Sequence, residues 1–133
     1  MNFTLIESEL DVKLPSFYKS TISDYPFQTK DELDFVEDNL VNDEKWVLES
    51  NKDLRENGFF EYSWPDNFFA IGHDGFGNFI FLNLKNSDAK IYSADHDFEF
   101  DINNLESLEY SSSMEEYIVM CIEDQQEIIG SDD

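Results

Sequence analysis

The chain has 133 residues, 41% hydrophobic and 16% aromatic, which supplies enough apolar material for one domain with a buried core. No apolar run approaches the about 18 residues that a membrane span needs, and no basic-then-apolar secretion signal opens the chain. The single cysteine, Cys121, excludes an internal disulfide and a thiolate zinc cluster within one chain, so we expect a reducing, cytoplasmic location.

The net charge of −23 comes from 31 acidic and 8 basic residues that are unevenly distributed. Residues 31–66 carry twelve acids and three bases, and thirteen acids but no Lys or Arg follow Lys90. A charge of this size disfavours direct binding to nucleic acid or to an anionic membrane. Two interpretations remain open: an acidic surface that keeps the protein in solution, or a surface that binds a basic partner.

Two short helices are predicted at the N-terminus. Asn2 can cap the first, whose apolar residues recur on one face at three- and four-residue spacing: Phe3, Ile6 and Leu10. The second begins at Pro15, because proline at a first helical position leaves no orphan donor. It extends to about Ser23 and buries Tyr18 and Ile22.

A strand and a longer helix are predicted next. Leu33, Phe35 and Val36 indicate a short strand among acidic residues. The helix covers Asp43–Arg55, with Asn42 or Asp43 as its cap and Gly58 just past its end. Its inward-facing residues are expected to be Trp46, Val47 and Leu54, with Leu48 as a further candidate.

The centre of the chain predicts a β-hairpin. Two aromatic and β-branched runs, Phe68–Ile71 and Phe79–Leu84, flank a linker that contains Gly72, Gly75 and Gly77. The second run is apolar at almost every position, so we expect a central strand covered on both faces. Alternation places Phe79 and Phe81 on the same face.

Further strands are predicted after the hairpin. Asn86–Asp88 forms a polar turn, and Lys90–Ser93 adds a third strand. Phe98, Phe100 and Ile102 alternate with acids, which is typical of a strand with one wet face. This strand is either continued or followed by a short extension at Leu105, Leu108 and Tyr110.

A final helix follows the serines at 111–113. Either Ser112 with Glu115 or Ser113 with Glu116 can form a capping box at its start. Its apolar stripe consists of Met114, Tyr117, Ile118, Cys121 and Ile122. The whole pattern predicts one α+β domain over residues 1–133, with N-terminal helices, a central antiparallel sheet of about five strands, and a C-terminal helix packed against the sheet.

Three segments in this order resemble the SUKH superfamily, which includes the Smi/Knr type of fungal cell-wall regulators and many bacterial immunity proteins. They are WPDNFFAIGHDGFGNFIFL at Trp64–Leu82, LPSFYK at Leu14–Lys19 and IYSADHD at Ile91–Asp97. The resemblance covers residues 10–122 and includes the serine-capped last helix. It departs from the family after Tyr18, where an Asn-Gly-Gly segment is common.

Residues with catalytic potential lack the patterns that catalysis needs. The glycines of the hairpin have strands on both sides and no lysine nearby, unlike a phosphate-binding loop. His73 and His96 have neighbouring aspartates but no metal-ligand spacing, and Cys121 lies on an apolar stripe. We therefore expect no enzyme activity, no catalytic residue, no metal and no cofactor.

The resemblance implies an immunity protein that neutralises a cognate bacterial toxin. Many toxins countered by the family are nucleases, whose basic cleft an acidic protein can occlude sterically and electrostatically. The alternatives are a regulatory interaction scaffold of the fungal type, or a small-ligand-binding domain with an aromatic cleft near Trp64. We expect a monomer or weak homodimer that contacts neither nucleic acid nor membrane. The candidate contact residues are Glu37, Asp38, Asp43, Glu44, Glu99, Asp101, Glu115 and Glu116.

Overall fold

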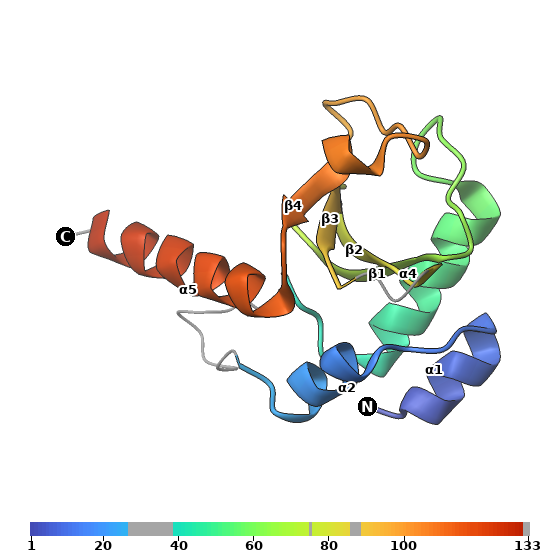
Figure 1. The fold of residues 1–133 in the computed structure, drawn as a ribbon, viewed down its shortest axis with the longest axis horizontal. Helices are drawn as coiled ribbons and strands as arrows, with labels where there is room; N and C mark the ends of the chain where they lie inside the picture. Colours follow the sequence, from blue (N-terminus) through green and yellow to red (C-terminus); the bar gives the residue numbers. More distant parts are fainter. Residues whose placement is uncertain (27–38, 75, 86–88, 132–133) are drawn as a thin grey trace.

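The computed structural model describes residues 1–26, 39–74, 76–85 and 89–131 and confirms the α+β class (Figure 1). Its α-helices are α1 (Phe3–Leu10), α2 (Ser16–Ser23), α4 (Glu44–Asn57) and α5 (Met114–Ser131). None of the helices in the described part of the chain has the length and apolar content of a membrane span.

The helix ends follow the predicted capping residues closely. The Asn2 side chain accepts a hydrogen bond from the Leu5 N–H, and Asp43 accepts one from the Lys45 N–H. Pro15 immediately precedes α2 instead of opening it. At α5, the Ser113 hydroxyl accepts from the Glu116 N–H at 3.2 Å, which is one of the two bonds of a Ser113–Glu116 capping box, while the Glu116 carboxylate accepts from the Ser112 hydroxyl.

Within the described residues, the sheet is antiparallel and has four strands, not about five. They are β1 (Phe68–His73), β2 (Phe79–Asn83), β3 (Ile91–Ala94) and β4 (Glu109–Ser111), in that spatial order. β2 is central, as predicted: its Phe81 lies opposite Ala70 on one side and Tyr92 on the other. The strand predicted at 33–36 and the turn predicted at 86–88 lie outside the described residues.

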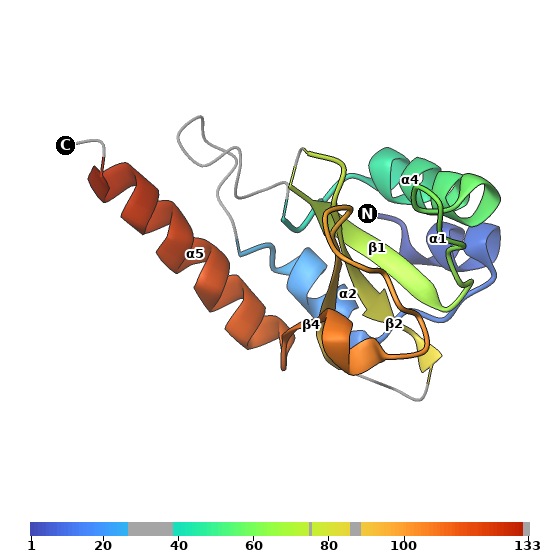
Figure 2. The same cartoon turned by 90° about the horizontal axis from the view of Figure 1, so that it is seen from above.

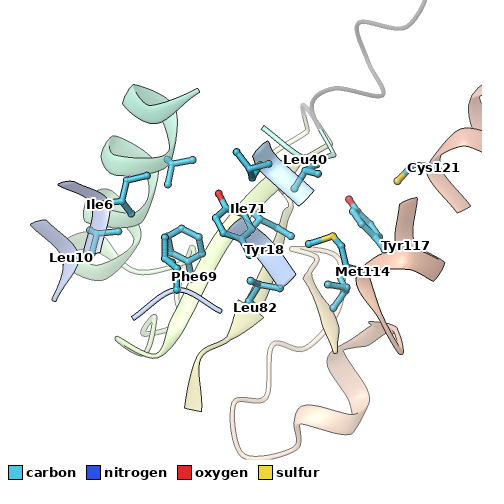
Figure 3. Packing of buried hydrophobic residues seen from close by; sticks show 14 residues of the cluster. Ile6, Leu10, Tyr18, Leu40, Phe69, Ile71, Leu82, Met114, Tyr117 and Cys121 are labelled. Atoms are coloured by element: carbon cyan, nitrogen blue, oxygen red, sulfur yellow. The ribbon is translucent and has the colours of Figure 1, made fainter. Parts of the chain in front are cut away.

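One face of the sheet packs against the helices. Figure 3 shows side chains from α1, α2, β1, β2 and α5 meeting in one buried cluster. Its members include Ile6, Leu10, Tyr18, Leu40, Phe69, Ile71, Leu82, Met114, Tyr117 and Cys121. Met114, Tyr117 and Cys121 from the first half of α5 take part, and Figure 2 shows the later part of this helix extending away from the body.

The opposite face of the sheet is covered mainly by loop residues, together with Leu54 from α4. The residues that follow α4 and those that follow β3 bring Trp64 and Phe100 over the sheet, with their rings stacked at 5.5 Å and 10°. Both rings contact Phe81 from β2, and Phe79 packs on the same side, as the alternation predicted. Trp64 is held by its indole N–H, which donates to the Phe68 carbonyl at 3.1 Å.

The strand predicted at 98–102 is wrong. Of its three alternating apolar residues only Phe100 is buried, while Phe98 and Ile102 are exposed. Asp95 and Asp101 accept hydrogen bonds from the backbone N–H two residues on, at 2.9 and 3.0 Å. These local turns compete with strand pairing. The chain then forms a short 3₁₀ helix, η3 (Leu105–Leu108), before β4.

The outer edge of β1 is closed by a buried asparagine from α4. Asn51 accepts a hydrogen bond from the Ala70 N–H at 2.7 Å and donates its amide to the Ala70 carbonyl at 3.1 Å. The Val41 N–H donates to the Ile71 carbonyl one residue further along. Edge groups that would otherwise offer pairing to another chain are therefore satisfied at these positions.

Candidate functional site

The acids predicted to bind a partner lie on separate elements. Glu99 and Asp101 belong to the loop after β3, Asp43 and Glu44 to the start of α4, and Glu115 and Glu116 to the first turn of α5. Glu37 and Asp38 lie outside the described residues. The six described acids therefore come from three separate elements of the fold.

Several of these acids have a local structural role. Asp43 caps α4, and Glu44 accepts a hydrogen bond at 2.6 Å from the backbone N–H of Asn2, which ties α4 to α1. Asp101 closes the turn at Asn103, and Glu116 accepts a hydrogen bond from the Ser112 hydroxyl. Glu99 and Glu115 are exposed, so they are the acids of this set best suited to substitution.

Three exposed phenylalanines mark a surface that the sequence analysis did not identify. Phe60, Phe76 and Phe98 are 62%, 80% and 71% exposed. They belong to the loop after α4, the β1–β2 connection and the turn after β3. Figure 1 shows the first and third of these loops side by side.

Contacts between the loops place these residues in one region. The Phe60 ring stacks on His96 with centroids 5.2 Å apart. It also lies against Gly77, where an added Cβ would be 3.4 Å from the Phe60 Cζ. Phe76 is the chain neighbour of Gly77, and Phe98 follows His96 by two residues. We call Phe60, Phe76, His96 and Phe98 the loop surface.

Hydrogen bonds hold the loop surface in place. Asn78 accepts the His96 N–H at 2.9 Å, and its amide oxygen is 2.6 Å from the His96 Nδ1, which joins the hairpin to the loop after β3. Asp74 accepts the Phe76 N–H at 2.8 Å and the Asn78 side-chain amide at 2.7 Å. Partial burial raises the pKa of Asp74, but these bonds outweigh it and hold that pKa below its ordinary value.

The groups with catalytic potential are engaged in packing. Burial raises the pKa of the Cys121 thiol to about 11, so at neutral pH it is protonated and a poor nucleophile. The His73 ring stacks on Trp46 at 5.3 Å. Among the described residues, no group of three His, Cys, Asp or Glu side chains is arranged to hold a metal ion.

The indole of Trp64, near which a cleft was predicted, is only 4% exposed and contacts Phe59, Phe68 and Phe100. The hollow beside it, of about 240 Å³, is lined mainly by residues 55–63 at the end of α4 and in the loop that follows. A groove of about 560 Å³ lies elsewhere, between the start of α2 and the end of β2. It contains Lys19, whose ammonium already pairs with Glu7 at 3.3 Å.

The sequence contains a signal from which the loop surface could have been predicted. Phe76 lies between Asp74 and Asn78, and Phe98 follows Asp95, so two of the exposed rings sit among turn-forming residues. An aromatic ring in such a position has no strand or helix face on which to pack. The reading of Phe98 as part of an alternating strand concealed this signal.

Comparison with known proteins gives one match. The family model described as SMI1 / KNR4 family (SUKH-1) matches residues 2–120, which is most of the chain and all of the described sheet. Comparisons with curated proteins and with solved structures found no match.

Proposed function

Because the chain belongs to the SMI1 / KNR4 family (SUKH-1), we propose that it is an immunity protein that binds and neutralises a cognate bacterial toxin. The family assignment is the observation that carries this proposal. It acts by binding and not by chemistry. The buried thiol and the stacked histidines fit this mode of action, since these groups serve packing.

A nuclease is the class of toxin that best fits the charge of the protein. A nuclease must attract phosphate, and its active-site cleft is therefore basic. A chain with a net charge of −23 is attracted to such a cleft, and long-range attraction speeds association. The protein then blocks the cleft by its bulk and by its charge.

A search of the neighbouring genes for a nuclease toxin, followed by co-expression with that toxin, tests this function. The expected result is a stable complex that co-purifies and has lost the nuclease activity of the free toxin. A complex that keeps full toxin activity would favour the second candidate, a regulatory scaffold of the Smi/Knr type. Absence of any complex, with both proteins folded, would contradict the immunity function.

A further inference from the structure

We propose that the loop surface is the part of this protein that contacts the toxin, and that it binds a basic surface rich in arginine. This inference rests on the proposed function, because it assigns the binding site that the function requires. Three properties of the described residues lead to it: exposed aromatic rings, a fixed arrangement of loops, and loop segments that carry acids but no Lys or Arg.

The exposed rings are the first property. Phenyl groups are normally buried, and clusters of exposed aromatic side chains mark protein–protein interfaces, where such rings supply much of the binding energy. Phe76 and Phe98 are more exposed than any other large hydrophobic residue for which the structure gives an exposure. Phe81 and Phe100, a few residues away along the chain, are buried in the core. Phe76 and Phe98 are therefore exposed because they lie in loops, and not because the protein lacks a core that can bury phenylalanine.

The fixed arrangement is the second property. Phe60 has a backbone φ of 54°, in the left-handed region that bulky residues rarely adopt. Strained backbone of this kind persists only where the surroundings impose it, and it is often found at binding sites. Here the ring stacks on His96, whose own backbone is bonded to Asn78. A surface arranged before binding loses less entropy when the partner arrives.

The charge around the rings is the third property and identifies the partner. The same loops carry only acids besides His96, and the sequence has no Lys or Arg between Glu56 and Leu84 or after Lys90. The acids of these loops are Glu61, Asp66, Asp74, Asp95, Asp97, Glu99 and Asp101. A guanidinium group stacks on aromatic faces and pairs with carboxylates at its edge, so rings bordered by acids suit arginine.

Binding of the neighbouring toxin tests the surface with a matched pair of double variants. Phe76→Ser with Phe98→Ser removes two exposed rings of the loop surface. Val119→Ser with Ile122→Ser removes two exposed apolar side chains of α5. We expect the first variant to bind the toxin at least about tenfold more weakly, mainly through faster dissociation, and the second to bind like the parent. Both should unfold at the parent's temperature.

Equal binding by the parent and the loop variant would overturn the assignment of the loop surface as the toxin-binding site and leave the immunity function intact. A parent protein that binds no toxin would overturn the immunity function. A second probe, an arginine-rich peptide, then tests whether the loop surface binds arginine. Nona-arginine titrated into labelled protein should shift the amide signals of Phe60, Gly77, His96 and Phe98 first. Shifts of equal size at the acids of α5, or shifts unchanged in the loop variant, would contradict the assignment.

Discussion

Phenylalanine has two opposite roles in the central hairpin, and the backbone position decides between them. Phe81 is in the middle strand, fully buried, with the rings of Phe68 at 4.5 Å and Trp64 at 5.1 Å. Phe76 is in the connection and is almost fully exposed. The same side chain therefore stabilises the fold at one site and is available to a partner five residues earlier.

Replacement of Phe81 by alanine tests the first role. We expect Phe81→Ala to reduce the free energy of unfolding by about 3–5 kcal/mol, because it removes a large ring from a closely packed cluster. Phe76→Ala is the control and should change that free energy by less than about 0.5 kcal/mol. Urea titration of both variants measures the difference, and a loss below about 1 kcal/mol for Phe81→Ala would show that the ring is not in the core.

Asn51 provides the second prediction at this scale. Asn51→Leu has a similar volume but leaves the Ala70 N–H and carbonyl without the amide that now pairs with both. A buried backbone group without a partner costs about 1–3 kcal/mol, so we expect a loss of at least about 2 kcal/mol. Asn57→Leu, at an exposed position of the same helix, is the control. Equal stability of the two variants would show that water replaces the Asn51 amide.

The elements that alternate cleanly or carry a cap could be predicted from the sequence. The hairpin runs are flanked by glycine, and helix α4 has Asp43 at one end and Gly58 at the other, so local chemistry and burial agree. Residues 98–102 have the period of a strand, yet Asp95 and Asp101 bond to the nearby backbone and only Phe100 is buried. An alternation of apolar and acidic residues with a period of two cannot reveal that Trp64 already covers this face of the sheet.

The turn of the hairpin depends on an ionised Asp74. Since its pKa in the folded protein lies below the ordinary value of 3.8, the folded state favours the carboxylate. The resulting stability is present above about pH 4 and is lost as the pH falls through the folded pKa. We therefore expect Asp74→Asn to be less stable than the parent at about pH 6 and the difference to shrink by about pH 3.

Unfolding free energies of the two proteins, measured in parallel across this range, check the prediction. The other acids titrate in both proteins, so their contributions cancel in the difference. This includes Glu7, whose pKa is lowered mainly by the hydrogen bond from the Leu14 N–H. A difference that stays constant with pH would show that the Asp74 charge has no part in the turn.

At the scale of the whole molecule, charge and shape specify different parts of the interaction. Acids are distributed along almost the whole chain, so their positions in the sequence do not identify a binding surface. The loop surface emerges only when the fold brings three distant loops together through His96 and Asn78. If the proposed toxin binds there, long-range attraction sets how fast it associates, and the rings set how slowly it dissociates.

The last prediction separates the effect of total charge from the effect of local charge by making the same charge reversal at two different sites. Glu99→Lys and Glu115→Lys alter the net charge equally, but Glu99 lies in the loop after β3 and Glu115 on α5. Association of the parent with its toxin should slow by about tenfold or more from low to physiological salt, because screening acts over about 8 Å. At low salt, Glu99→Lys should slow association more than Glu115→Lys.

Glu99→Lys should not lower the thermal stability, because it relieves repulsion within a strongly negative chain. In Glu115→Lys this gain is offset by the cation placed in the first turn of α5. Stopped-flow association rates in a salt series, with melting curves for all three proteins, provide the measurement. Equal slowing by the two reversals would mean that the total charge decides the rate and that Glu99 is no nearer the contact than Glu115. Rates that respond to neither salt nor reversal would remove electrostatic attraction from the mechanism. Recognition would then depend on the exposed rings of Phe60, Phe76 and Phe98.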